Sequence, residues 1–194
     1  LFVLKNNILI ATIDIEDDIK ENTNEVISEV NSFGINTSLL SGDKKEKCKY
    51  LSDKISFNSV YSEQLPHEKL EIIKQRSLSE TTAMIGDGIN DAPSLSIASV
   101  GISVGGSTGV AIQSSDVVLL NKNNLKQLTT ALKISKHTFL TIKQNLFWAF
   151  AYNIVAIPIA AMGYLNPMWA ALFMAFSDVI VVGNSIRLKY KKLD

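Results

Sequence analysis

Three aspartates stand in glycine-containing segments that follow short apolar runs. Asp87 and Asp91 lie four residues apart in MIGDGINDAP, and Asp43 ends the tripeptide SGD. Taken singly, these residues have structural explanations, because Asp-Gly is a turn pair and an aspartate before APSL suits a helix N-cap. Taken together at one edge, the carboxylates would repel each other unless a cation lay among them. Carboxylate oxygens shared with phosphate are typical of a magnesium site, which favours magnesium-dependent phosphoryl transfer.

Two further residues suit the same chemistry. Lys69 lies one turn into a segment opened by Pro66, from where its ammonium could reach a bound phosphate. Ser41 of SGD offers a hydroxyl and a loop N–H to a phosphoryl oxygen. A solvated lysine and a turn serine are the alternative interpretations. None of these residues is an evident nucleophile.

The segments that would position these residues alternate between strands and helices. This alternation predicts an α/β fold with a parallel sheet covered by helices on both faces. Loops that follow parallel strands meet at the carboxyl edge of the sheet, so we expect SGD and GDG to lie at one rim. The predicted strands are 8–15, 35–40, 58–62, 81–86, 99–104 and 116–120, and the predicted helices are 18–33, 44–54 and the segment that Pro66 begins. Gly34 is placed as a helix stop.

The last third of the chain has a different composition. From Gln144 to Ile186 the only formally charged residue is Asp178. After a helix predicted at 124–143, two apolar segments at 145–163 and 167–186 approach the roughly 20 residues that cross a hydrocarbon core. We therefore expect a two-helix transmembrane hairpin with aromatic residues near its ends, and two buried helices of a water-soluble core are the alternative. The flanking cations, which place both ends in the cytoplasm, are Lys133, Lys136, Lys143, Arg187, Lys189, Lys191 and Lys192.

Composition limits the other functional classes. The chain has 19 basic and 19 acidic residues, and this balance gives no electrostatic footprint for nucleic acid. Its one cysteine, Cys48, excludes a disulfide within the chain and is expected to be a small buried apolar group. The sequence begins LFVLKNN, which resembles no signal peptide and suggests a start inside a longer protein.

Residues 84–120, from MIGDGINDAP to DVVLL, resemble the hinge region of P-type ATPases, which belong to the haloacid dehalogenase class of folds. DDIKENTNEVI, LLSGDKKEK and QLPHEKLEIIKQ resemble three other blocks of that family, in the same order and with similar spacing. The resemblance implies a Rossmann-like phosphorylation domain, present in part. Ser41 stands where the family usually has threonine, which also carries a hydroxyl.

The resemblance also implies roles for individual residues. Asp87 becomes a magnesium ligand, and Asp91 and Asn90 complete the shell of the ion and the geometry around the phosphate. Lys69 stabilises the phosphoryl group, with Ser41 and Asp43 beside it. Asp17 matches an aspartate in the hinge near the nucleotide domain.

The nucleophile of the family is an aspartate in D-K-T-G-T, and this sequence contains no such stretch. The resemblance therefore implies the C-terminal part of a pump, whose ATP-binding domain and phosphorylated aspartate lie upstream. Alone, this part is not expected to hydrolyse ATP. The implied divisions are 1–123 in the phosphorylation domain, 124–143 in a helical stalk, 144–186 in two transmembrane helices and 187–194 in a basic cytoplasmic tail. A cell-membrane location is expected.

The final spans resemble pumps for monovalent copper, which carry a Tyr-Asn pair and a Met-x-x-Ser-Ser motif. The resemblance makes Tyr152, Asn153, Met174, Ser177 and Asp178 candidate ligands of transported copper or silver. A thioether suits such a soft ion, but Asp178 replaces the second serine. Zinc and cadmium pumps use an aspartate in their last span, usually within Asp-x-Gly, so they remain an alternative. A phosphatase tethered by a membrane hairpin and a truncated, non-catalytic metal-binding membrane protein are the others.

Overall fold

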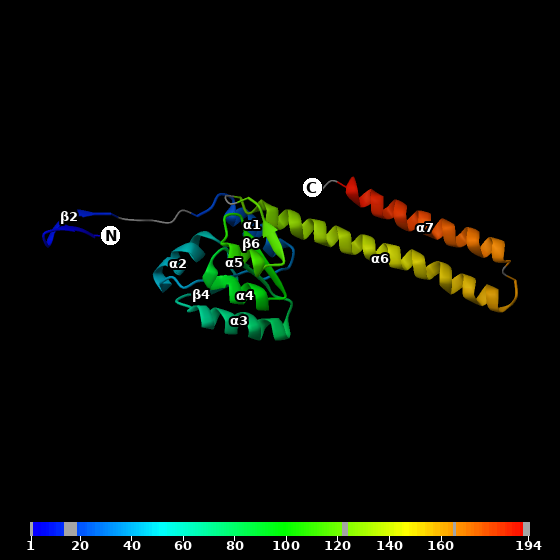
Figure 1. Ribbon diagram of the computed structural model, residues 1–194, viewed down its shortest axis with the longest axis horizontal. Coiled ribbons are helices and arrows are strands. Elements are labelled where there is room, and N and C mark those ends of the chain that lie inside the picture. The colour runs from blue at the N-terminus through cyan, green and yellow to red at the C-terminus, as the bar shows by residue number, and fades with distance from the viewer. Residues whose placement is uncertain (1, 14–18, 122–123, 165, 192–194) are drawn as a thin grey trace. The chain divides into compact units, whose positions relative to one another are not determined.

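The computed structural model describes residues 2–13, 19–121, 124–164 and 166–191 (Figure 1). The chain divides into two compact units, Leu1–Gln127 and Leu128–Asp194. The first unit contains short strands and helices in alternation, whereas the second consists of two long helices. The unit boundary lies close to residue 124, where the sequence predicted the stalk to begin.

The first unit opens with a hairpin. Strand β1 (Phe2–Lys5) pairs antiparallel with β2 (Ile8–Thr12). The two connecting residues, Asn6 and Asn7, have φ of 50° and 60°, which matches the two-residue turns that favour asparagine at left-handed positions. The prediction of a first parallel strand at 8–15 is therefore wrong in its pairing, because Asn6 and Asn7 reverse the chain just before it.

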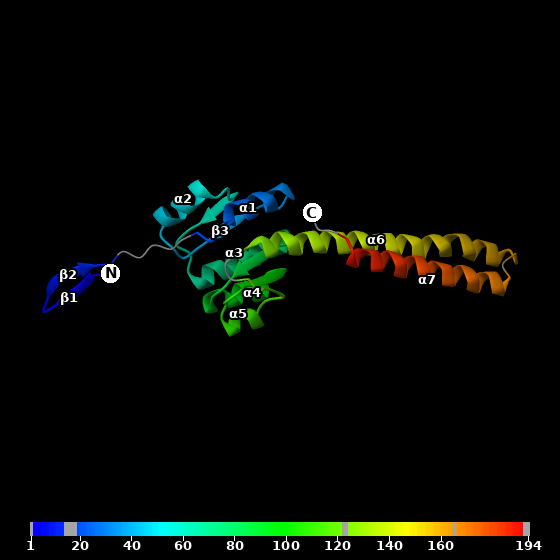
Figure 2. The same cartoon turned by 90° about the horizontal axis from the view of Figure 1, so that it is seen from above.

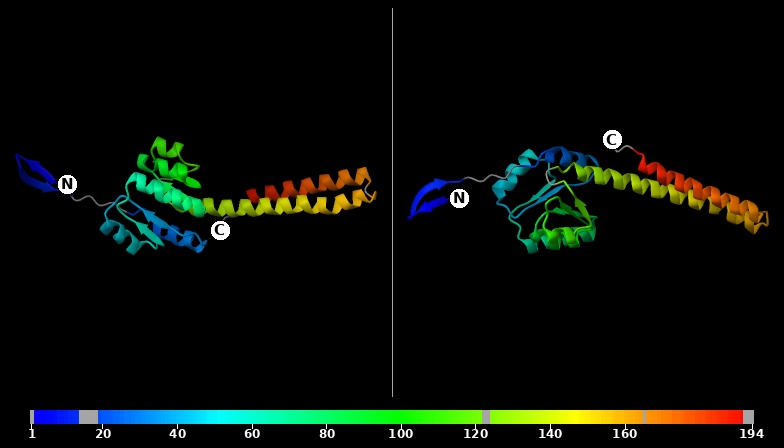
Figure 3. Two further views of the ribbon diagram at one scale, coloured as in Figure 1. Left: turned by 90° about the horizontal axis from the view of Figure 1, so that it is seen from below. Right: turned by 45° about the horizontal axis from the view of Figure 1, so that its top comes forward.

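The remaining strands are parallel, as the sequence predicted. They form two sheets, β3-β4 and β5-β6-β7, and no pairing between these sheets occurs within the described residues (Figure 3). The single sheet expected from the sequence is thus present as two separate pieces. The elements are α1 (Thr23–Ser32), β3 (Ser38–Leu40), α2 (Lys45–Lys54), β4 (Ser59–Tyr61), α3 (Pro66–Ser79), β5 (Ala83–Gly86), η1 (Ile89–Asp91), α4 (Ala92–Ile97), β6 (Val100–Val104), α5 (Gly109–Gln113) and β7 (Val117–Leu119).

One apolar cluster joins elements of this unit. Ile73 of α3, Met84 of β5, Leu95 of α4 and Ala111 of α5 are buried together, and Leu40 of β3 packs against them. Leu95 is completely buried. The two sheets therefore contribute to the same core, although they are not hydrogen-bonded to each other.

Several local predictions are confirmed. Gly34 follows α1 with φ of 78°, which a glycine adopts without the steric cost of a Cβ. Cys48 is fully buried in α2, as expected for a small apolar group. Helix α1 begins at Thr23, later than residue 18 where the sequence pattern placed its start.

Helix α3 is also tied to β4 by a polar contact. The Arg76 guanidinium donates to the Tyr61 hydroxyl at 2.7 Å, and this bond lowers the pKa of Tyr61. Arg76 also pairs with Glu80 one turn further along α3, at 3.0 Å. The β4 end of the first sheet is thereby anchored to the helix that carries Lys69.

The second unit consists of α6 (Lys126–Ala161) and α7 (Pro167–Lys189), which run side by side (Figure 2). Both are long and apolar enough to cross a membrane. Helix α6 runs without a break through both the predicted stalk, 124–143, and the predicted first span. Its one internal proline in the described residues is Pro158, near its C-terminal end.

Candidate functional site

The segment from Gly86 to Asp91 is folded tightly back on itself. Strand β5 ends at Gly86, and the chain passes through Asp87 and Gly88 into the short helix η1. A Cβ added at Gly86 would lie only 2.8 Å from the Cβ of Asp91, closer than non-bonded carbons tolerate. Glycine is therefore required at position 86, because Asp91 returns to the end of the strand that precedes it.

Asp91 is held by an ion pair. Its Oδ1 atom accepts a hydrogen bond from the Lys69 ammonium at 2.9 Å. The two side chains are only 16% and 14% exposed, so the pair is screened by solvent less than a surface pair. Asp91 occupies the N-cap position of α4 but makes no side-chain cap bond there. Asp91 is therefore the N-cap residue by position, as the sequence suggested, but its carboxylate binds Lys69 rather than a backbone N–H of the helix.

Lys69 is positioned by the first turn of α3. Pro66 begins this helix, and the Glu68 carboxylate accepts the Leu65 backbone N–H at 2.7 Å. This is half of a capping box, and it fixes where the helix starts. The lysine predicted to reach a phosphate thus lies beside the GDGIND loop, 22 residues away in sequence. Its partner Asp91 is a contact that the sequence did not reveal.

Ser41 and Asp43 form a compact turn after β3. The Ser41 hydroxyl donates to Asp43 Oδ2 at 3.0 Å and accepts the Asp43 backbone N–H at 3.1 Å. The other carboxylate oxygen pairs with Lys47 at 3.3 Å. Backbone bonds from Glu63 to Asp43 and from Gln64 to Ser41 hold this turn to the loop after β4. Asp43 therefore finds its counter-charge in α2.

The side chains of Asp87 and Asn90 are exposed. The backbone carbonyl of Asp87 accepts the Thr108 N–H at 3.1 Å, which ties the loop to the N-terminus of α5. Within the described residues, no three acidic, histidine or cysteine side chains gather closely enough to hold a metal ion. The structure therefore does not assemble the predicted rim carboxylates Asp43, Asp87 and Asp91 into one cluster. Asp17, the predicted hinge residue, lies outside the described residues.

The donor set nevertheless fits magnesium. This ion is commonly held by one or two carboxylates together with water and substrate phosphates. Asp87 offers an exposed carboxylate. In Asp91 the bond to Lys69 uses the Oδ1 atom, so the Oδ2 atom is the one that could bind a metal ion. The GDGIND loop thus supplies two carboxylates and leaves the remaining positions for phosphate and water.

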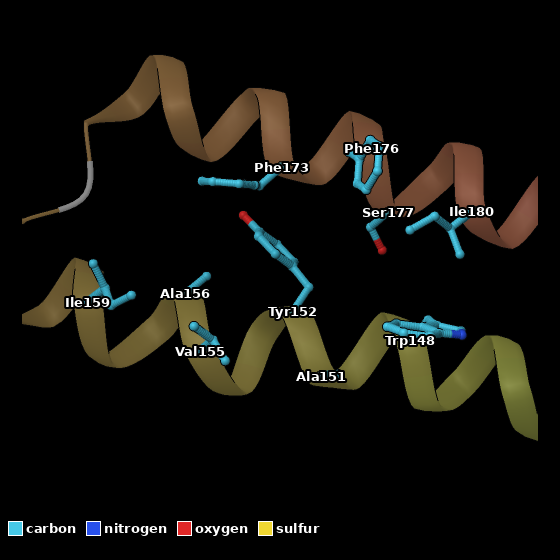
Figure 4. A pocket seen from close by; sticks show the side chains of 10 residues that line it. All are labelled: Trp148, Ala151, Tyr152, Val155, Ala156, Ile159, Phe173, Phe176, Ser177 and Ile180. Carbon is cyan, nitrogen blue, oxygen red and sulfur yellow. The ribbon is translucent and has the colours of Figure 1, made fainter.

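In the second unit, an apolar groove of about 410 Å³ lies between α6 and α7 (Figure 4). Tyr152 points from α6 toward α7, and its hydroxyl donates to the Ala170 carbonyl at 3.1 Å. Ser177 lines the same groove. Two of the five predicted metal ligands are therefore brought together.

The other three predicted ligands lie elsewhere on the helices. Asn153 is exposed, and its amide donates to the Ala149 carbonyl of its own helix at 2.8 Å. Met174 is 61% exposed, and Asp178 is exposed one turn further along α7. Because they are four residues apart, Met174 and Asp178 share a helix face. These three residues do not line the groove with Tyr152 and Ser177.

A group of amide side chains, which the sequence analysis missed, joins the two helices. Asn184 donates to Asn145 at 2.8 Å and to Gln144 at 3.3 Å. Asn145 in turn donates to Ser185 at 2.9 Å. We call these four residues the amide group. The signal available in the sequence was the pairing of polar residues at corresponding ends of two apolar segments.

The parallel βα units, with GDGIND following one strand, define a haloacid dehalogenase-like fold. Residues 3–98 match the haloacid dehalogenase-like hydrolase family. A copper-transporting ATPase 2 of Rhizobium meliloti (strain 1021) is 43% identical over 189 residues, which cover 93% of this chain and 23% of the relative. A copper-exporting P-type ATPase of Staphylococcus aureus (strain JH9) is 38% identical over 195 residues, covering 100% and 24%.

Solved structures agree in fold. A crystal structure of a zinc-transporting PIB-type ATPase in the E2.Pi state has a TM-score of 0.86 and 27% identity, over 96% of this chain and 31% of that chain. A catalytic CPx-ATPase domain gives a TM-score of 0.55 and 31% identity, over 63% and 49%. The chain belongs to the heavy-metal P-type ATPases, and it spans about a quarter of the length of the curated relatives it matches.

Proposed function

We propose that this chain is the C-terminal part of an ATP-driven pump that exports monovalent copper from the cytoplasm. The pair of Lys69 and Asp91 beside Asp87 carries this proposal, because it gathers a cation and two carboxylates at the end of one strand. The sequence similarity to copper-transporting ATPases over almost the whole chain supports the choice of family and ion.

Each residue of the site has a proposed role in phosphoryl transfer. Asp87 and Asp91 would hold magnesium, which neutralises charge on phosphoryl oxygens when it is bound. Lys69 would place its ammonium between Asp91 and a phosphoryl oxygen. The hydroxyl of Ser41, which donates to Asp43 here, would turn to donate to another phosphoryl oxygen while it still accepts the Asp43 backbone N–H. Asn90 would orient the groups around the phosphate.

The phosphorylated aspartate is proposed to come from the upstream part of the same pump. Within the described residues, β3 pairs only with β4, and β5 pairs only with β6. Leu40 of β3 nevertheless packs against the cluster that contains Met84 of β5. A further parallel strand would satisfy the unpaired edges of β3 and β5 and bring a nucleophile beside Asp87. Asp17 would belong to the hinge toward the ATP-binding domain.

In the membrane, Asp178 supports the presence of further helices. It lies midway along α7 and is exposed. Inserting a charged residue at the bilayer centre costs about 2.5–3.5 kcal/mol or more. We therefore infer that the face with Met174 and Asp178 packs against other spans of the pump, where it would meet the transported ion. Asn153, Tyr152 and Ser177 would complete the ion pathway. The cations at both helix ends favour a cytoplasmic location for these ends and insertion in the cell membrane.

The test uses the complete protein encoded by the gene. Reading the gene upstream should reveal an in-frame D-K-T-G-T. The purified pump should then form a hydroxylamine-sensitive phosphoenzyme from ATP, and monovalent copper or silver should stimulate it. A protein that forms no such adduct under any metal would refute the pump. The tethered-phosphatase alternative predicts phosphatase activity from this chain alone.

Zinc or cadmium is the second candidate ion. The observation that favours it is Asp178, since carboxylate oxygen suits a harder divalent ion than a thioether does. The solved zinc-transporting PIB-type ATPase also resembles this chain over 96% of its length. Phosphoenzyme turnover stimulated by zinc and indifferent to copper would select this alternative.

A further inference from the structure

Five cations gather where the C-terminal end of α7 lies beside the first half of α6. Two of them lie on α6 and three at the end of α7. All five side chains are exposed. We call this set the basic collar, and it consists of Lys136, Lys143, Arg187, Lys189 and Lys191.

Contacts between the helices bring the collar together. Lys191 lies 3.0 Å from the Nδ1 atom of His137, the residue that follows Lys136. About two turns further along α6, the amide group holds the helices together, with Asn145 donating to Ser185 at 2.9 Å. Lys143 precedes the amide group on α6, and Arg187 follows it on α7. The cations of the two helices therefore lie at similar heights along the hairpin.

No carboxylate pairs with the collar among the residues that the structure describes. None of its five cations forms a salt bridge with another described residue. Between Leu128 and Lys191 the only acidic residue is Asp178, which lies nine residues before Arg187, or about 13 Å along a helix. The positive charge of the collar is therefore not neutralised by any acidic side chain between Leu128 and Lys191.

The collar borders directly on apolar surface. Leu140, Ile142 and Leu146 of α6 are 45%, 49% and 51% exposed, and Ile186 of α7 is 54% exposed. Lys136 and Lys143 are seven residues apart on one face of α6, which is about 10 Å of helix. The headgroup layer of a bilayer is roughly 5–8 Å thick on each side. The two lysines therefore span this layer and extend slightly beyond it. Cations directly beside apolar side chains suit a lipid, whose phosphate binds the cations and whose acyl chains cover the apolar surface.

We propose that the basic collar binds the headgroups of anionic phospholipids. The occupant is a phosphate diester lipid rather than free phosphate, because acyl chains can cover the apolar residues beside the cations. Each cation near an anionic membrane surface raises the association constant about fivefold. The collar belongs to the second unit, whereas the GDGIND loop belongs to the first.

The test is the lipid preference of the full chain in nanodiscs of mixed phosphatidylcholine and phosphatidylglycerol. Spin-labelled versions of both lipids report their relative association with the protein. The wild type should prefer phosphatidylglycerol. Replacing three collar cations with glutamine, in Lys136→Gln, Lys143→Gln and Arg187→Gln together, should lower this preference at least about fivefold. High salt should lower it in the wild type.

A matched control removes three exposed lysines from the first unit, as Lys44→Gln, Lys45→Gln and Lys49→Gln. This variant should keep the wild-type preference, as should the arginine variant Lys136→Arg with Lys143→Arg. Should the triple collar variant fail to insert, Lys143→Gln alone should give a smaller fall. The proposal is overturned if the wild type shows no preference, if the collar variants keep it or if the control loses it equally. Loss of the preference in the presence of soluble glycerol phosphate would instead assign the collar to free phosphate.

Discussion

The two units of this chain meet opposite physical demands. The residues before Leu128 include 12 basic and 17 acidic side chains, whereas those from Leu128 onward include 7 basic and 2 acidic ones. The first unit buries a cluster around the fully enclosed Leu95. In α7, by contrast, none of the described residues is buried. The first unit has a core of its own, whereas the apolar side chains of the second are left to contact lipid and neighbouring helices.

This difference indicates where each kind of chemistry can be built. A closed core holds Lys69 and Asp91 at a fixed separation, so this part of the proposed phosphoryl site is already in place within one unit. The predicted ion ligands of the second unit are split between a groove and an exposed face. Their assembly needs further helices, because a two-helix hairpin cannot surround an ion.

The largest expected effect comes from emptying the core of the first unit. The variant Leu95→Ala should lower the free energy of unfolding by about 3 kcal/mol, because it leaves a cavity where Leu95 is fully buried. Hydrogen exchange of the full chain in micelles should show amides of β5 and β6 exchanging about 100-fold faster. The matched variant Leu172→Ala, at a 57% exposed position of α7, should leave those amides unchanged. Equal effects of the two variants would contradict the contrast between the units.

The next prediction separates chemistry from folding. In the complete pump, Asp87→Asn should reduce phosphoenzyme formation about 100-fold or more, because a charged ligand is replaced by a neutral one. The carboxylate of Asp87 is exposed, so stability should change little. The measurement combines phosphoenzyme yield from ATP with thermal unfolding. Retention of near-wild-type phosphorylation would exclude Asp87 from the magnesium site.

A smaller effect should follow from Gly86→Ala. The added methyl group would lie 2.8 Å from the Asp91 Cβ, so the loop must shift, and phosphoenzyme formation should fall about tenfold. In Gly88→Ala the nearest atom would be 3.9 Å away, and activity should be close to that of the wild type. An equal loss of phosphoenzyme formation in both variants would show that the close approach of Asp91 to position 86 does not determine activity.

The smallest prediction concerns the hairpin. The variant Asn184→Leu removes two hydrogen bonds to α6 and should weaken the pairing of the helices by about 1 kcal/mol. The distance between spin labels near the two helix ends should broaden. Asn153→Leu is the matched control, since its amide binds only its own helix. No difference between the two variants would indicate that apolar packing alone holds the helices together.

Much of the first unit was predictable from local sequence. The alternation of strands and helices, the parallel pairing, the glycine after α1 and the burial of Cys48 follow from short-range patterns. The pairing of Lys69 with Asp91 did not, because it joins residues 22 positions apart that only the packing of α3 against α4 brings together. The hairpin of β1 and β2 was missed because two left-handed asparagines look like an ordinary polar linker.

In the second unit, composition predicted two apolar helices and their length. It also predicted the helix that precedes the first span, and α6 joins the two segments without a break because no residue between them stops a helix. Helical spacing could not assign Tyr152 and Ser177 to one groove and Asp178 to another face, because that depends on the register between the helices. This register is set by contacts such as Asn184 with Asn145.

The bond between Lys69 and Asp91 also sets the charge that the GDGIND loop presents to its surroundings. With one of its two aspartates already neutralised, the loop presents a single uncompensated negative charge to an approaching anion. A phosphate that arrives therefore faces weaker repulsion than the count of carboxylates suggests. In the proposed site the ammonium would keep its bond to Asp91 and donate another proton to the phosphate, so the anion would bind without a large rearrangement of the surrounding chain.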